Sequence, residues 1–454
     1  MATNPRVDPV TDIIVPEPPR LVSAPDTWDP QFQDQYSNVL RLYFNRLTNL
    51  LRELNVANGE TGIYPLGTAG DAFGRLRTSA PYTLFNSNNR FQKDNQFDET
   101  LTAGATSTYS SPNASVTLAL DGTASQSAIR QTYRVFPYQP GKSLLVFSTF
   151  SMGAALGGVE TKVGYFDGTN GVYFRRSGST LYFEILKDGS VTETVAQASW
   201  NGDKMDGTGV SGVTLDPTKT QILYMDFEWL GVGTVRCGFV QDGQTYVCHS
   251  FHHSNTFSTV YMTTATLPIR YEIEDSAGAG TASSLQQICS TVMSEGGYQQ
   301  VSVDHVARRS TELTTISSTF VPLISIRLAS GRNGAVILVN RVQALPTVTQ
   351  FYEVILVKNP TLTGASWSAT DSANVEFDES ATSYTGGTIV QQDYITSTAQ
   401  GRLSVDAPTG YNWELQLGAD LSGTSDIFMV AIRTLSPPPT GGSWASLSFY
   451  DLTQ

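Results

Sequence analysis

The sequence predicts a mainly β protein: an N-terminal extended arm and one long helix, followed by a jelly-roll-like β-sandwich and a second, smaller β-sandwich domain. Charged residues make up only 15% of the chain, below the roughly 25% of typical soluble domains. Aromatic residues reach 10%, which suits sheets with buried inner faces. Turn pairs recur between short strand-like runs from about residue 95 onward. These pairs are Asp121-Gly122, Pro140-Gly141, Asp167-Gly168, Ser177-Gly178, Asp188-Gly189 and Asp242-Gly243.

The clearest single element is a hairpin over residues 225–251. Apolar and polar residues alternate on both sides of Asp242-Gly243, a pair that tolerates positive φ at both central turn positions. A two-residue turn would place Phe239 opposite Tyr246, on one face of the hairpin. That face is expected to be buried.

The same register would place Cys237 opposite Cys248. Three cysteines in 454 residues are too few for a disulfide scaffold, so a reduced, buried pair is expected rather than a bridge. Arg236 and His249 are expected on the less buried face.

The N-terminal segments carry the features that predict assembly. Residues 1–30 are rich in proline and should form an extended docking arm. Its docking residues are Ile13, Ile14, Val15, Pro16, Pro18, Pro19 and Leu21. Residues 31–58 begin after Asp29-Pro30, a helix start signal, and carry two apolar stripes at helical spacing. The stripe residues are Phe32, Tyr36, Val39, Leu40, Tyr43, Phe44, Leu47, Leu50, Leu51 and Leu54.

Two apolar stripes on one helix require partners, so the helix either packs on its own sheets or bundles with copies of itself. A homotrimer is the preferred state, because three helices can bury both stripes. A linker arm over 59–94 should then lead to a β-sandwich over 95–305 and a C-terminal β domain over 306–454. In that last domain, strands are expected from Val321, Ala335, Phe351, Trp413 and Ile427, followed by a short tail at 444–452.

The charge balance excludes several functions. The net charge of −13 argues against a nucleic-acid binder and against docking on an anionic membrane. No apolar run approaches the roughly 20 residues that span a bilayer, and the N-terminus lacks a signal-peptide pattern. We therefore expect synthesis in a cytoplasm without secretion.

Several sequence blocks resemble a family of bacteriophage virion structural proteins, whose members are largely uncharacterised. The blocks are DAFGRLRTSAPYTLFNS at 71–87, PYQPGKSLLVF at 137–147, VGYFDGTNGVYF at 163–174, DFEWLGVGTVRCGF at 226–239, LPIRYEIE at 267–274 and LQQICSTVMSEGGY at 285–298. The resemblance implies a β-rich virion component, assembled in the host cytoplasm with other virion proteins. It implies no catalytic residue.

Three groups of residues could form a metal or catalytic site, and each also has a simpler structural explanation. Cys248, His249, His252 and His253 could ligate a metal, but no second pair lies at standard zinc spacing. Glu228, Glu272 and Glu274 could form a glycosidase pair, although exposed carboxylates on strands are far more common. Asp203, Asp206 and Asp216 lie in a glycine-rich stretch without regular calcium-ligand spacing. No enzyme activity, metal or cofactor is expected.

Three functions remain open at this level. The preferred one is an oligomeric, tail-associated fibre or appendage component anchored by the arm and the helix. A capsid decoration, cement or head-fibre protein is the alternative. A module that binds host-surface carbohydrate is the third, and it rests on fold analogy alone.

Overall fold

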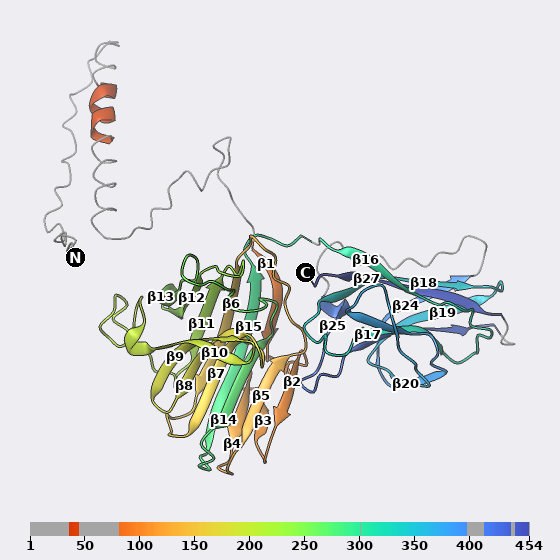
Figure 1. Ribbon diagram of the computed structural model, residues 1–454, viewed down its shortest axis with the longest axis horizontal. Coiled ribbons are helices and arrows are strands. Elements are labelled where there is room, and N and C mark those ends of the chain that lie inside the picture. The colour runs from red at the N-terminus through yellow and green to blue at the C-terminus, as the bar shows by residue number, and fades with distance from the viewer. Residues whose placement is uncertain (1–35, 45–80, 300, 397–412, 437–440, 454) are drawn as a thin grey trace. The chain divides into compact units, whose positions relative to one another are not determined.

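The computed structural model describes residues 36–44, 81–299, 301–396, 413–436 and 441–453 (Figure 1). The chain divides into two compact units, residues 1–79 and residues 80–454. In the first unit the structure describes one short helix, over residues 36–44. The long helix predicted over 31–58 is therefore not shown, and its other residues lie outside the described part of the chain. No helix in the described ranges is both long and apolar enough to traverse a lipid bilayer.

The second unit is built almost entirely of antiparallel strands, which confirms the mainly β prediction. Its N-terminal half contains two large sheets. The eight-stranded sheet runs β13 (Gln244–Phe251), β12 (Val235–Gln241), β11 (Gln221–Phe227), β6 (Leu144–Met152), β15 (Ser283–Ser294), β4 (Ser115–Leu120) and β3 (Thr106–Ser110), with β1 (Tyr82–Asn88) also paired to β15. The seven-stranded sheet runs β10 (Ser190–Ala196), β9 (Thr180–Lys187), β8 (Gly171–Ser177), β7 (Val159–Phe166), β14 (Ile269–Asp275), β5 (Ser127–Thr132) and β2 (Phe97–Leu101). A 3₁₀ turn at Gln197–Ser199 follows β10.

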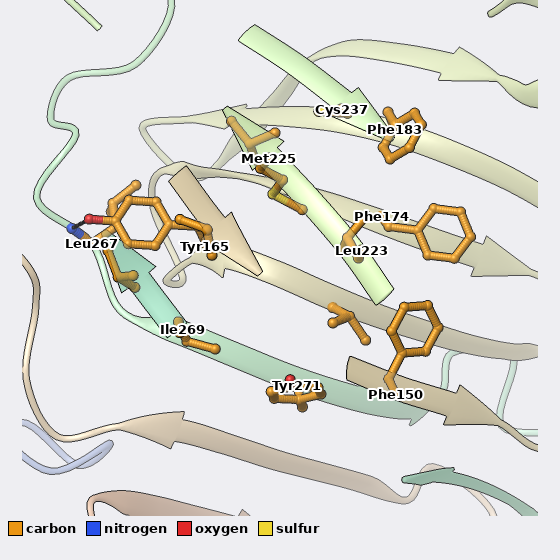
Figure 2. Packing of buried hydrophobic residues seen from close by; sticks show 14 of the residues in the cluster. Phe150, Tyr165, Phe174, Phe183, Leu223, Met225, Cys237, Leu267, Ile269 and Tyr271 are labelled. Atoms are coloured by element: carbon orange, nitrogen blue, oxygen red, sulfur yellow. Dashed lines mark hydrogen bonds between the residues drawn. The ribbon is translucent and has the colours of Figure 1, made fainter. Parts of the chain in front are cut away.

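An aromatic core lies between these two sheets. Strand β6 alternates buried and half-buried residues along its length, as expected when one face of a strand is covered. Its Phe150 packs 5.8 Å from Phe174 of the opposite sheet (Figure 2). Phe174 also packs 5.2 Å from Phe239 of β12. Tyr165 is also fully buried and accepts a hydrogen bond of 3.1 Å from the N–H of Leu267, which satisfies its hydroxyl (Figure 2). The first sandwich therefore has one continuous core.

Five of the six predicted turn pairs lie between strands, and Ser177-Gly178 begins at the last residue of β8. At Asp188-Gly189 and Asp242-Gly243 both residues have positive φ, the geometry of the tight turn that matches strand twist. The second of these turns closes the predicted hairpin, with Gln241 opposite Gln244 and Phe239 opposite Tyr246.

The predicted register is wrong at the cysteines. The pairing shifts by one residue between Cys237 and Gly238, so Cys237 lies opposite His249 and Cys248 is the extra residue of a bulge. The extra residue also changes which side chains are covered. His249, predicted on the less buried face, is buried, while both cysteines are free and buried.

The C-terminal half of the unit forms a second sandwich. One sheet runs β16 (Val303–Arg308), β27 (Ser443–Asp451), β18 (Ile337–Pro346) and β25 (Gln416–Leu417), which follows a 3₁₀ turn at Trp413–Leu415. The other runs β21 (Ser368–Ala369), β22 (Val375–Asp378), β17 (Val321–Leu328), β26 (Ile427–Thr434), β19 (Phe351–Lys358) and β24 (Thr388–Thr396). A small two-stranded sheet of β20 (Thr361–Thr363) and β23 (Ser383–Thr385) completes it. Buried aliphatic residues of β17, β18, β19, β26 and β27 form its core.

Two segments have a larger structural role than the sequence indicated. The expected tail at 444–452 is strand β27, which pairs with both β16 and β18 inside its sheet. Within the expected linker arm, Tyr82–Asn88 pairs with β15 in the first sandwich. The two sandwiches also share hydrogen bonds, because Gln416 donates to the carbonyl of Val135 at 3.0 Å and Leu421 N–H donates to Asp98 at 2.7 Å.

Candidate functional site

The described helix presents apolar side chains to solvent. Leu42 is 60% exposed, Phe44 58% and Val39 39%, whereas Tyr36 and Tyr43 are half-buried. Leu40, from the second predicted stripe, is half-buried as well, and Leu42 belongs to neither predicted stripe. The other predicted assembly residues lie outside the described residues: Phe32, Leu47, Leu50, Leu51 and Leu54. So do those of the docking arm: Ile13, Ile14, Val15, Pro16, Pro18, Pro19 and Leu21.

The histidines that were weighed as possible metal ligands do not converge. His253 is fully buried, its Nδ1 lies 2.5 Å from the carbonyl oxygen of Gly233, and its Nε2 lies 2.8 Å from Glu193 Oε1. Its ring stacks on Tyr261 at a centroid distance of 4.0 Å.

The neighbouring groups have separate partners. Asn201 N–H donates to His249 Nδ1 at 3.3 Å, and burial lowers the pKa of His249. His252 Nδ1 lies 3.4 Å from the hydroxyl of Thr234, and the Cys248 thiol faces a backbone carbonyl. Within the described ranges, no three Cys, His, Asp or Glu residues form a group that could hold a metal ion.

The glutamates form an ion-pair ladder on the seven-stranded sheet. Lys162 Nζ donates to Glu272 Oε1 at 2.9 Å and to Glu274 Oε1 at 2.7 Å, and Arg270 Nε donates to Glu272 Oε2 at 2.7 Å. Burial alone would raise the pKa of Glu272, but Arg270 and Lys162 together hold it below its usual value. Glu272 is therefore poorly suited to donate a proton. Glu228 is exposed and takes no part in this ladder.

The three aspartates each stabilise their own turn. Asp203 accepts hydrogen bonds from the N–H groups of Met205 and Ser211, at 2.8 and 2.6 Å. Asp206 and Asp216 each accept from the N–H and hydroxyl of the threonine two residues later. Such local bonds are the usual role of aspartate in turns. The three carboxylates are therefore engaged locally rather than arranged around a shared site.

A groove that the sequence did not predict lies on the second sandwich. It has a volume of about 1580 Å³ and is lined by residues of β16, β18 and β27, together with residues 369–371 and Phe377. In the register of these three strands, Arg308, Ser446 and Gln343 form one row. Two residues further along β27 lies Trp444, opposite Leu345. Polar and apolar side chains thus alternate in rows across the groove.

Most charged groups in the groove already have partners. Arg309 is buried and donates to the carbonyl oxygens of Thr311, Leu323 and Glu379. Asp304 accepts a hydrogen bond of 2.9 Å from Asn340.

Two further charged groups line the groove. Asp371 lies 3.1 Å from His305 Nδ1. Arg308 is exposed, and it makes no ion pair with any residue that the structure describes. Its guanidinium is therefore available to a ligand.

Comparisons with known proteins show likeness only at the level of solved structures. No protein-family model matches the sequence, and a search of curated proteins found no match. The protein of unknown function SO2946 from Shewanella oneidensis MR-1 is 12% identical, with a TM-score of 0.34, covering 62% of this chain and 100% of its own. The Emp47p carbohydrate recognition domain is 11% identical, with a TM-score of 0.30, covering 47% of this chain and 95% of its own. A legume lectin-like domain from Entamoeba histolytica is 9% identical, with a TM-score of 0.28, covering 43% and 89%. At these TM-scores the likenesses carry no argument about function.

Proposed function

We propose that this chain is a structural component of a bacteriophage virion, an oligomeric, tail-associated fibre or appendage protein that assembles through its N-terminal arm and helix. The resemblance to phage virion proteins supports this proposal. Five of its six blocks fall on strands β6, β7, β8, β11, β12, β14 and β15 or on the turns that join them. They therefore belong to one structural body, the first sandwich, rather than to scattered loops.

The observation that carries the assembly role is the exposed apolar surface of the helix over 36–44. Leu42, Phe44 and Val39 together expose apolar area that water disfavours, at roughly 25 cal/mol per Å². A stretch of this kind is stabilised when another helix covers it. We propose that the covering helices come from two further copies of the chain, because a trimer buries more than one face of each helix.

The two sandwiches would then form the outward part of the appendage. The strands of the first sandwich would be connected as in a jelly roll. A capsid decoration or head-fibre role uses the same helix and arm. It differs only in the protein on which the arm docks.

Cryo-electron microscopy of the purified particle, with a small tag fused after residue 454, separates these roles. Tag density at the tail supports the proposed function. Density on the capsid surface replaces it with the decoration role. Particles that lack the chain, judged by mass spectrometry of the same preparation, would refute a virion role altogether.

A further inference from the structure

We propose that the groove on the second sandwich is a carbohydrate site that binds neutral hexose oligosaccharides. This goes beyond the structural role, since binding in the groove is a property of the chain itself and does not depend on a virion. Four features of the groove support this proposal: an exposed aromatic platform, a polar row beside the platform, an available arginine and a balanced local charge.

The platform consists of Trp444 and Leu345. Trp444 is 39% exposed and Leu345 57%, and the two lie opposite each other on β27 and β18. Val306 of β16, 46% exposed, adds apolar surface at another position of the same groove. A broad indole face in a concave site suits a ligand with one apolar face, such as the C–H face of a pyranose ring.

The polar row lies within reach of the same ring. Ser446 lies two residues from Trp444 along β27, about 7 Å at the usual rise of a strand, and Arg308 and Gln343 lie opposite Ser446 on the two neighbouring strands. Ser446 donates its hydroxyl to Gln343 Oε1 at 3.2 Å, and no partner for the amide nitrogen of Gln343 is found among the described residues. That nitrogen and the guanidinium of Arg308 are donors, and a sugar hydroxyl is a fitting acceptor for both.

Arg308 differs from four other strand arginines of the molecule. Arg175, Arg270, Arg327 and Arg433 each form an ion pair with a glutamate of their own sheet. Arg308, in contrast, faces the groove without a carboxylate partner in the described ranges. Its fixed set of donors is therefore free to bind two neighbouring hydroxyls at once.

The charge of the groove decides the class of saccharide. Asp304 and Asp371 balance Arg308 and Arg309 in its lining, while the whole chain carries −13. A negatively charged protein repels an anionic polysaccharide, and this groove offers no surplus of positive charge to overcome that repulsion. Neutral hexose chains are not repelled by the negative charge of the protein.

Isothermal titration calorimetry on the purified full-length chain tests the proposal, with cellohexaose, maltohexaose and mannohexaose as neutral probes. At least one probe should bind to the wild type. Trp444→Ala and Arg308→Ala should each weaken that binding by about tenfold or more, as expected when a central contact of a small site is removed. Phe351→Ala is the matched control, because Phe351 is 62% exposed on β19, outside the groove, and its loss should leave affinity unchanged.

Three outcomes overturn the inference. The first is an absence of binding by all three probes at about 10 mM, a concentration well above the millimolar affinities of weak sites. The second is unchanged affinity in both groove variants. The third is a stronger response to hexagalacturonate, which would assign the groove to anionic chains. Circular dichroism melting of each variant shows whether it is folded, and Gln343→Ala replaces Trp444→Ala if the latter is not.

Discussion

At the scale of single residues, His253 is a fully buried side chain of the first sandwich with a partner at each ring nitrogen. Both ring nitrogens face oxygen acceptors, the Gly233 carbonyl and the Glu193 carboxylate, so both contacts are donated only when both nitrogens carry hydrogen. We expect His253→Phe to keep the stack on Tyr261 but to leave both oxygens without a donor. The free energy of unfolding should fall by about 3 kcal/mol, measured by urea denaturation.

Glu193→Gln is the matched control for that variant. The glutamine amide can donate to Nε2 while Nδ1–H remains bonded to Gly233, so every polar group keeps a partner. A loss below about 1 kcal/mol is expected. Equal losses in the two variants would show that ring packing, rather than hydrogen bonding, fixes His253.

The ion pairs of Glu272 predict a pH dependence. Because Arg270 and Lys162 hold the pKa of Glu272 below its usual 4.5, this carboxylate contributes stability at pH above 4.5. The contribution is lost as pH falls through the lower pKa of the folded state. Lys162→Met should cost about 1.5 kcal/mol at pH 7, since Glu272 loses one of its two cationic partners but keeps Arg270.

The difference in unfolding free energy between wild type and Lys162→Met should shrink when urea titrations are repeated at progressively lower pH below 4.5. Lys219→Met is the control. Lys219 is 79% exposed and lies 3.9 Å from Asp216, and such surface pairs contribute about 0–1 kcal/mol. A pH-independent difference for Lys162→Met would mean that its effect comes from packing.

At the scale of elements, the hairpin of β12 and β13 shows what a strand pattern can and cannot predict. Period-2 alternation and Asp242-Gly243 correctly predict the turn and the pairing of Phe239 with Tyr246. The alternation does not show whether one strand holds an extra residue. The bulge that moves Cys248 out of register could therefore not be predicted from it. Gly238 within the strand was the available signal, since an interior glycine often marks a bulge.

Gly238→Ala should disrupt this hairpin. A Cβ at that position would lie 2.0 Å from the carbonyl oxygen of Tyr246 and 2.7 Å from the ring of Tyr224, so the strands must move apart. We expect a loss of about 2–3 kcal/mol in urea denaturation.

The turn glycine of the same hairpin provides the comparison. Gly243 has φ +76°, and a Cβ added there would meet no atom within 4 Å. Asparagine tolerates that backbone conformation. Gly243→Asn should therefore change the free energy of unfolding by less than about 1 kcal/mol. A Gly238→Ala protein as stable as Gly243→Asn would contradict the close approach at the bulge.

At the scale of the whole molecule, sequence patterns predicted the strands but not the surface that they build together. The strands from Val321, Phe351 and Ile427 are present where expected, because buried strands have a strong apolar signature. The groove draws on residues 304–310, 343–345, 369–371 and 444–446. Register between segments about 100 residues apart is set by tertiary packing, so no local pattern could place Arg308 beside Trp444.

The assembly proposal makes the last prediction. Mass photometry of the wild-type chain should give a species of about three times its 49.2 kDa. Leu42→Asp should shift it to monomers, because a carboxylate at a position that is 60% exposed in the single chain would be buried in a helix bundle. Arg41→Asp places a carboxylate at an exposed polar position on the side of that helix away from Val39 and Tyr43, and it should leave the trimer intact. A wild-type chain that is monomeric would refute the trimer proposal. Equal dissociation of the two variants would show that charge repulsion, and not the loss of apolar packing, separates the copies. Dissociation by Leu42→Asp alone identifies the apolar helix surface as the contact that holds the copies together.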